Sequence, residues 1–130
     1  MNLLLDTHAA IWWLDDSNRL GSKARKALVE PKNTAWISAV SVWEISIKMS
    51  LGKLELREEP EIGIISMLDQ GFRPLPIVLR HAFALRHLPL HHNDPFDRLL
   101  IAQAQSEEFS LLSADPWMLA YDVRTIDASA

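Results

Sequence analysis

Short apolar runs alternate with helical segments along this chain, and the alternation restricts the fold more than any other feature. Leu3–Leu5 is followed by Asp6, Thr34–Ser38 leads into a helical segment, and Phe109–Ser113 is followed by Asp115. Runs of this length are typical of strands, and strands separated by helices favour parallel pairing in one sheet. The pattern therefore predicts an α/β fold with a largely parallel central sheet.

Apolar spacing and capping residues predict the other elements. Helices are expected over six segments, which are Ala9–Leu14, Ser22–Glu30, Ser41–Leu51, Pro60–Asp69, Val78–Arg86 and Asp94–Glu107. Shorter elements are a helical turn at Pro116–Ala120 and strands at Leu75–Ile77 and Val123–Ile126. Ser22 is the expected N-cap of its helix, and Asp94 followed by proline is a strong helix start.

The size and composition of the chain indicate one compact domain over residues 1–130. The chain has 130 residues, 48% of them hydrophobic, and no cysteine. It contains no apolar run near the roughly 20 residues that a membrane span needs, and its first residues lack the features of a signal peptide. We therefore expect a cytoplasmic protein with no membrane partner, no disulfide and no thiolate metal site.

Four acids stand at the borders of apolar runs, and they are the best indication of function. They are Asp6, Glu44, Asp97 and Asp115. In a parallel sheet, side chains at the carboxyl ends of strands meet at one edge. Carboxylates gathered there repel one another unless a cation compensates them, and Mg²⁺ and Mn²⁺ prefer oxygen ligands. The four acids are therefore candidate metal ligands.

A capping role is the competing explanation for most of these acids. Ser41 and Glu44 have the spacing of a capping box, and Asp115 before Pro116 matches an N-cap followed by the first helical residue. Asp6 is the exception, because it follows a strand and precedes no convincing long helix. Capping alone explains each of the others, and only their number favours a metal site.

Net charge bears on the choice of partner. The formal net charge is −4, whereas proteins that bind nucleic acid usually carry a basic surface. If the four acids form one metal site, however, the rest of the chain is neutral. The acidity therefore weakens a nucleic-acid function without excluding it.

Three neighbouring residues are candidate accessory groups. The hydroxyls of Thr7 and Ser113 lie beside acids in the sequence and either orient a carboxylate or bind turn backbone. Arg98 is expected to form an ion pair with Asp94 four residues earlier, and its alternative roles are to orient Asp97 or to bind phosphate.

The histidines do not favour a zinc site. His8, His91 and His92 show no H-x-x-x-H spacing, and hard acids outnumber them. We expect surface or backbone-bonded histidines near the site, with contact between His91 or His92 and a nucleic-acid phosphate as the less favoured alternative.

Several segments together resemble the PIN-domain family, and within it the VapC-type toxin ribonucleases of VapBC toxin–antitoxin pairs. The resemblance runs from Leu3 to about Ile126 and rests on LLLDTHAAIWWL, SAVSVWEISIK, LGKLEL, LPLHHNDPFDRLLIAQA and LLSADPWMLAYDV. HHNDPFDRLLIAQA is the most specific of these segments. The resemblance implies a three-layer α/β/α domain.

The resemblance also implies an activity, which is endoribonuclease cleavage that depends on Mg²⁺ or Mn²⁺ and leaves 5′-phosphate and 3′-hydroxyl ends. By motif, the four acids become the catalytic and metal-binding residues, and metal-activated water hydrolyses the phosphodiester. Asp94 is assigned as accessory, because Asp97 better matches the family's D-x-x-I-A pattern. RNA is then the substrate, a cognate antitoxin the partner, and a homodimer the expected assembly.

Two alternatives from other functional classes stay open at this point. One is a non-catalytic module whose acids cap helices and dock a basic partner. The other is a Mg²⁺-dependent phosphotransfer domain, but its expected second aspartate is replaced by His8 and no lysine follows the fourth strand.

Overall fold

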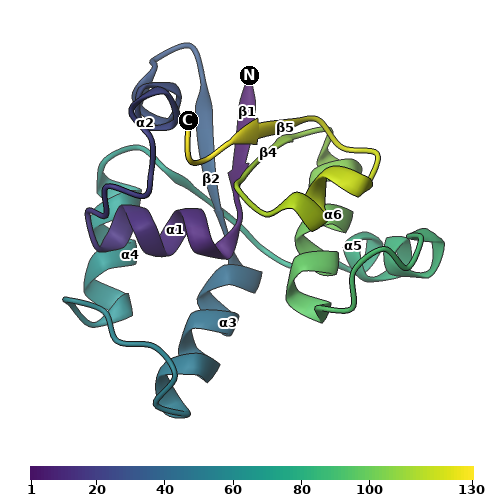
Figure 1. The fold of residues 1–130 in the computed structure, drawn as a ribbon, viewed down its shortest axis with the longest axis horizontal. Coiled ribbons are helices and arrows are strands. Elements are labelled where there is room, and N and C mark those ends of the chain that lie inside the picture. The colour runs from purple at the N-terminus through teal and green to yellow at the C-terminus, as the bar shows by residue number, and fades with distance from the viewer.

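The computed structural model describes residues 1–130 and contains one sheet of five strands, in which every neighbouring pair is parallel. The strands are β1 (Asn2–Leu5), β2 (Thr34–Ser38), β3 (Arg73–Leu75), β4 (Ser110–Ser113) and β5 (Thr125–Asp127). Their spatial order is β3-β2-β1-β4-β5 (Figure 1). The predicted parallel sheet is confirmed.

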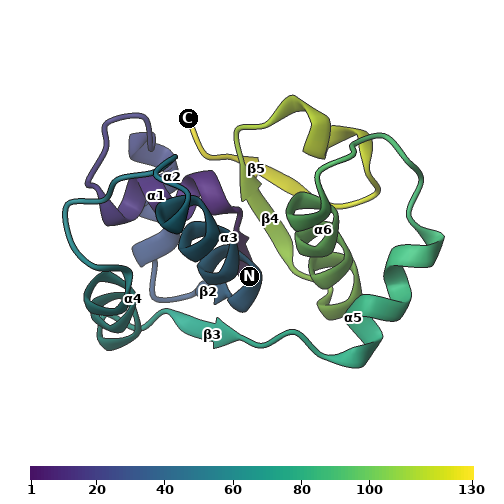
Figure 2. The ribbon, with the colours of Figure 1, turned by 90° about the horizontal axis from the view of Figure 1, so that it is seen from below.

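Helices cover both faces of this sheet, which gives the predicted three layers (Figure 2). On one side lie α1 (Thr7–Leu14), α2 (Ser22–Val29) and α4 (Pro60–Asp69), and on the other lie α5 (Leu79–Ala84) and α6 (Pro95–Glu107). Two 3₁₀ turns, η1 (Leu85–His87) and η2 (Pro116–Ala120), complete the second side. No helix has the length and apolar character to cross a membrane.

The central strand explains why two separate cores form. In β1, Leu3 and Leu5 belong to the core under α1, α2 and α4, whereas Leu4 belongs to the core under α6. All three leucines are fully buried, as expected for a strand with helices on both faces. Side chains alternate between the faces, so three successive leucines supply both cores.

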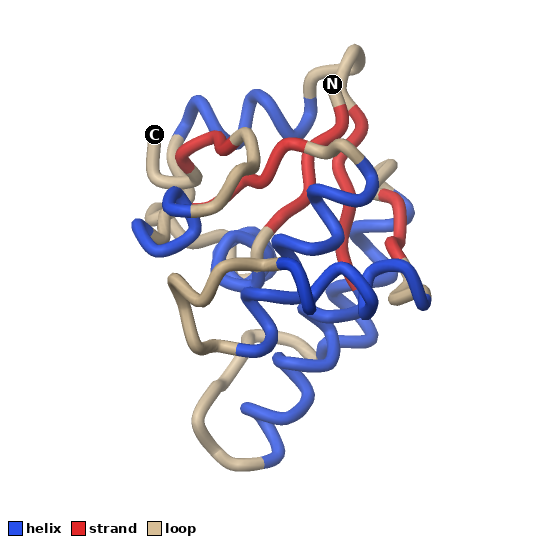
Figure 3. Tube along the Cα trace, turned by 90° about the vertical axis from the view of Figure 1, so that its right-hand side faces the viewer, coloured by secondary structure: helices blue, strands red, loops and turns tan.

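Helix α3 (Ala39–Ser50) packs against both α1 and α6, below the carboxyl ends of the strands (Figures 1 and 3). It joins both cores, because Val40 lies in the core under α6 and Val42 packs against the core under α1. Its position brings a third helix to the sheet edge where α1 and α6 begin.

The order of the strands creates a crevice at this edge. From β1 the chain proceeds through β2 to β3 on one side, and β4 and β5 extend the sheet on the other side. Such a reversal between β1 and β4 is where parallel sheets open beyond their carboxyl ends and bind ligands. Asp6 and Ser113 stand at these two strand ends.

Some predicted boundaries are wrong. Ser22 is the first helical residue rather than the N-cap, and Gly21 occupies the cap position. A Cβ at Gly21 would lie 2.1 Å from the carbonyl carbon of Ala130, so the close approach of the C-terminal backbone requires glycine there. Strand β3 is two residues earlier than expected, and β5 begins two residues later than expected.

The capping box predicted at Ser41 and Glu44 is also wrong. Helix α3 begins at Ala39, and Ser38 is its N-cap, with a side-chain oxygen that accepts a hydrogen bond from the Val40 amide at 3.0 Å. Ser41 and Glu44 are therefore inside the helix, and both are buried. The burial of Glu44 then needs another explanation.

Candidate metal centre

Asp6 follows β1 directly and uses both carboxylate oxygens. Oδ1 accepts a hydrogen bond from the Ala9 amide at 2.8 Å, and Oδ2 accepts one from Ser113 Oγ at 2.6 Å. Asp6 therefore caps α1, contrary to the expectation that it caps no helix. Burial raises the pKa of Asp6, although the bonds from Ser113 and Ala9 oppose the shift.

Glu44 lies in α3 with one oxygen satisfied and the other without a partner. Lys48, four residues later in the same helix, places its Nζ 2.6 Å from Oε2. Oε1 is buried and accepts no hydrogen bond. Burial of a carboxylate oxygen without a hydrogen-bond partner is energetically unfavourable. A cation bound beside Oε1 would supply the missing partner.

We expect Lys48→Met to lower the stability of the metal-free protein by about 1–2 kcal/mol, because Glu44 would lose its only partner. Thermal unfolding in EDTA measures the change, with Lys53→Met as the control, since Lys53 is exposed and makes no ion pair. Adding Mn²⁺ should narrow the gap, because the cation supplies the missing positive charge. An equal deficit with and without Mn²⁺ contradicts this.

Asp94 is the N-cap of α6, as predicted. Its Oδ1 accepts hydrogen bonds from the amides of Phe96 at 2.9 Å and Asp97 at 3.1 Å. The cap fixes the first turn of α6 and with it the direction of Asp97.

Asp97 lies in the first turn of α6 and is mostly buried. Its Oδ2 is 2.8 Å from His92 Nε2. Burial raises the pKa of Asp97 to about 6, against the hydrogen bond from His92, and the negative charges of Asp94, Glu44 and Asp6 raise it further. The neighbouring acids thus repel this carboxylate, as expected for a cluster that lacks a cation.

Asp115 follows β4 and caps η2, as predicted, through the Trp117 amide at 3.0 Å from Oδ1. Its own amide donates to Ser113 Oγ at 3.1 Å, and that hydroxyl donates in turn to Asp6. Ser113 thus links the two acids at the ends of β1 and β4, as its candidate accessory role requires. The charge of Asp115 contributes to the raised pKa of Asp6.

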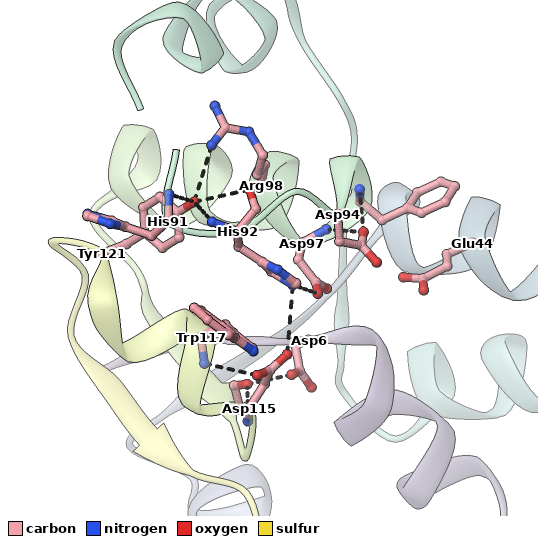
Figure 4. Close-up of polar contacts among 12 residues, drawn as sticks. Asp6, Glu44, His91, His92, Asp94, Asp97, Arg98, Asp115, Trp117 and Tyr121 are labelled. Carbon is pink, nitrogen blue, oxygen red and sulfur yellow. Dashed lines mark hydrogen bonds and ion pairs between the residues drawn. The ribbon is translucent and has the colours of Figure 1, made fainter. Parts of the chain in front are cut away.

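The structure brings the four sequence-predicted acids to one place from four separate elements (Figure 4). His92 lies between them, with Nε2 2.8 Å from Asp97 and 3.9 Å from Asp115 Oδ2. One ligand atom from each of His92, Asp94 and Asp97 lies within 4.8 Å of the other two. The donor set, the unpartnered Glu44 oxygen and the mutual repulsion all fit a divalent cation.

Two accessory candidates form hydrogen bonds with groups other than the acids. Thr7 Oγ1 donates to Ser41 Oγ at 3.1 Å, which joins the start of α1 to α3 in a buried contact. Arg98 forms no ion pair with Asp94, so that prediction is wrong. Its guanidinium donates to the Pro89 carbonyl at 2.9 Å and to the Tyr121 hydroxyl at 3.2 Å. Arg98 therefore holds the loop before α6.

Sequence reasoning missed His92 as a member of the cluster. The expectation of a surface or backbone-bonded histidine does not describe its side chain, which is only 20% exposed and contacts an acid. The one signal is its place two residues before the Asp94 cap. The reach of a loop side chain does not follow from spacing, because loops have no fixed period.

The cavities agree only in part with this location. A small cavity of about 240 Å³ borders Asp6 and Asp115, with His8 and Trp12 on its wall. A larger one of about 680 Å³ lies at the opposite end of the sheet, near Asn2 and Arg124, and contains none of the four acids. The chemistry of the side chains therefore locates the candidate site better than cavity size does.

Comparison with known proteins settles the family. The sequence model of the PIN domain matches residues 3–124. The chain belongs to the PIN-domain family. A curated relative of this PIN domain is Ribonuclease VapC22 of Mycobacterium tuberculosis (strain ATCC 25618 / H37Rv), which is 28% identical over 114 residues, or 87% of this chain and 86% of the relative.

Solved structures show the same PIN fold. VapBC2 from Rickettsia felis, bound to a promoter DNA fragment, has a TM-score of 0.72 at 13% identity and covers 97% of this chain and 98% of its own. VapBC-1 from nontypeable Haemophilus influenzae has a TM-score of 0.66 at 16% identity, with both chains fully covered. At these identities the likeness establishes the fold alone.

Proposed function

We propose that this PIN domain is a metal-dependent endoribonuclease, the toxin of a VapBC-type toxin–antitoxin pair. The observation that carries the proposal is the meeting of Asp6, Glu44, Asp97 and Asp115 at the crevice between β1 and β4. The curated relative named as a VapC ribonuclease supports the reaction, and the VapBC complexes of the same fold support the partner.

The four acids would hold Mg²⁺ or Mn²⁺, and the bound ion would stabilise the negative charge that develops on the phosphodiester during hydrolysis. The protein's own contribution is to hold these ligands before the substrate arrives. Ser113 fixes Asp6, Lys48 fixes Glu44, and His92 contacts Asp97. Ligands held in this way cost little reorganisation in the reaction.

Exposed aromatic rings on two sides of the acids support single-stranded or loop RNA as the substrate. Trp117 is 60% exposed and stacks on His92 with ring planes 11° apart. Trp43 is 51% exposed and packs edge-on against Phe96. Unpaired bases stack on such rings, whereas bases in a duplex are not free to do so.

An apolar groove supports the antitoxin as partner. It has a volume of about 570 Å³ and lies between α3, α4 and β3, where Val42, Trp43, Ile64 and Pro74 line it. Apolar grooves of this kind accept the apolar face of a partner helix. A homodimer and a cytoplasmic location stay predictions.

Incubation of the purified chain with single-stranded RNA and Mn²⁺ tests the proposal. We expect cleavage with 5′-phosphate ends, and a loss of at least about a hundredfold in Glu44→Gln, because a ligand to the cation contributes several kcal/mol to the transition state. Asp69→Asn is the matched control, since Asp69 is an exposed acid at the end of α4.

The capping contacts of Asp6, Asp94 and Asp115 favour one alternative, a non-catalytic module in which the acids serve only as caps. A calorimetric Mn²⁺ titration separates the two functions. If the protein binds no divalent cation and leaves the RNA intact, the nuclease function is rejected and the non-catalytic module is favoured.

A further inference from the structure

His92 is held beside the acids by contacts outside the acidic cluster. The Tyr121 hydroxyl lies 2.9 Å from the His92 amide and 3.2 Å from the His91 amide, so it accepts from this part of the loop. Arg98 donates to the same hydroxyl and to the Pro89 carbonyl. These contacts fix the backbone of His92 from α6 and from the residue after η2.

The imidazole is fixed as well as the backbone. Its ring stacks nearly parallel on Trp117, with centroids 6.2 Å apart. Its Nε2 points to Asp97 and Asp115, which belong to elements on opposite sides of the crevice (Figure 4). A histidine that is merely at the surface needs none of these contacts. The placement of the His92 side chain therefore indicates a role at the candidate metal centre.

The separation of donor atoms suits two ligands of one ion. His92 Nε2 and Asp97 Oδ2 are 2.8 Å apart. Adjacent ligands of an octahedral ion with bonds of about 2.1 Å are about 3.0 Å apart, and opposite ligands about 4.2 Å. The 2.8 Å separation of the His92 and Asp97 donor atoms is therefore close to the spacing of adjacent ligands.

We propose that His92 Nε2 is a direct ligand of the metal ion, so that the centre is a mixed nitrogen and oxygen site rather than a purely carboxylate one. The inference rests on the proposed metal-dependent function. Both ions bind carboxylate oxygen, but Mn²⁺, a first-row transition metal, accepts imidazole nitrogen more readily than Mg²⁺ does. Such a centre has a stronger preference for Mn²⁺ over Mg²⁺ than a site built from carboxylates alone.

Ligation requires the neutral imidazole with its lone pair free on Nε2. Without metal, a proton between Nε2 and Asp97 Oδ2 makes their hydrogen bond. As ligands, Nε2 and Oδ2 would both face the cation with lone pairs, so the proton between them would leave to solvent or move to Nδ1. The competing role is that of an outer group that only orients Asp97 by hydrogen bonding.

Electron paramagnetic resonance of the Mn²⁺-loaded protein distinguishes the two roles. We expect a hyperfine coupling from a directly bound nitrogen, which changes when the protein is labelled with ¹⁵N-histidine. His92→Gln should remove this coupling, whereas His91→Gln and His8→Gln should keep it. His91 packs on Tyr121, and His8 lies near Asp6, so these two variants test the neighbouring imidazoles.

The unsubstituted protein decides the question even if His92→Gln fails to fold. Absence of nitrogen coupling in a sample that binds Mn²⁺ overturns the inference and leaves the proposed nuclease intact. Failure to bind Mn²⁺ at all rejects the proposed function instead.

Calorimetry gives a second measurement. His92→Gln should weaken Mn²⁺ binding by at least about tenfold and Mg²⁺ binding by less, so the preference for Mn²⁺ shrinks. An equal loss for both ions overturns direct ligation, because an outer hydrogen bond to Asp97 would affect the two ions alike.

Discussion

Asp97→Asn is expected to abolish RNA cleavage and, at the same time, to stabilise the metal-free protein. The pKa of Asp97 rises from 3.8 to about 6 in the folded protein, so the folded chain holds this proton more tightly than the unfolded chain. Stability from this group is therefore greatest below pH 4 and falls as the pH rises to about 6. At pH 7 the ionised carboxylate costs about 2–3 kcal/mol, and neutral asparagine avoids that cost.

Thermal unfolding in EDTA at pH 7 and an RNA cleavage assay measure the two effects. Asp94→Asn is the matched control, because asparagine also caps helices well. We expect Asp94→Asn to keep measurable activity, whereas Asp97→Asn loses at least about a hundredfold. Similar behaviour of the two variants would show that the assignment of ligand to Asp97 and cap to Asp94 is wrong.

Metal affinity should rise steeply with pH, which is the second large effect. About one tenth of Asp97 is ionised at pH 5 and about nine tenths at pH 7, given its pKa of about 6. Because the cation binds the ionised form, the affinity for Mn²⁺ should rise about tenfold over this range from Asp97 alone. The raised pKa of Asp6 acts in the same direction.

Calorimetric titrations in buffers of different ionisation enthalpy measure both the affinity and the protons released. Asp97→Asn, where it still binds, should show a weaker dependence on pH. An affinity that stays constant between pH 5 and pH 7 would mean that the ion binds elsewhere.

The periodicity of apolar residues and the residues that start and stop helices predict most of the fold. The apolar run Leu3–Leu5 in β1 and the Asp94-Pro95 start of α6 are local signals, and the structure confirms both. The start of α2 depends instead on a distant contact, because the C-terminal backbone lies against Gly21. The start of α3 was placed wrongly, since Ser38 and Ser41 are both suitable caps and only packing distinguishes them.

The candidate site shows the same division between local and distant signals. The four acids were found because each borders an apolar run, and the sheet brings those borders together. Arg98 was misjudged because helical spacing favours a pair with Asp94, whereas the loop carbonyls offer the guanidinium several acceptors at once. The direction of a loop side chain such as His92 depends on tertiary contacts, which periodicity does not encode.

The double use of the aspartates has a genetic consequence. Asp6 and Asp115 each direct Oδ1 to a helix start, and asparagine retains one carbonyl oxygen for that bond. A single substitution of asparagine for aspartate at either position would therefore inactivate the proposed toxin and leave its fold intact. Such an inactive chain would still bind the antitoxin. In a cell that carries both alleles, it would compete for the antitoxin and leave active toxin unbound. The inactive allele would therefore be harmful only in a cell that also carries the active one.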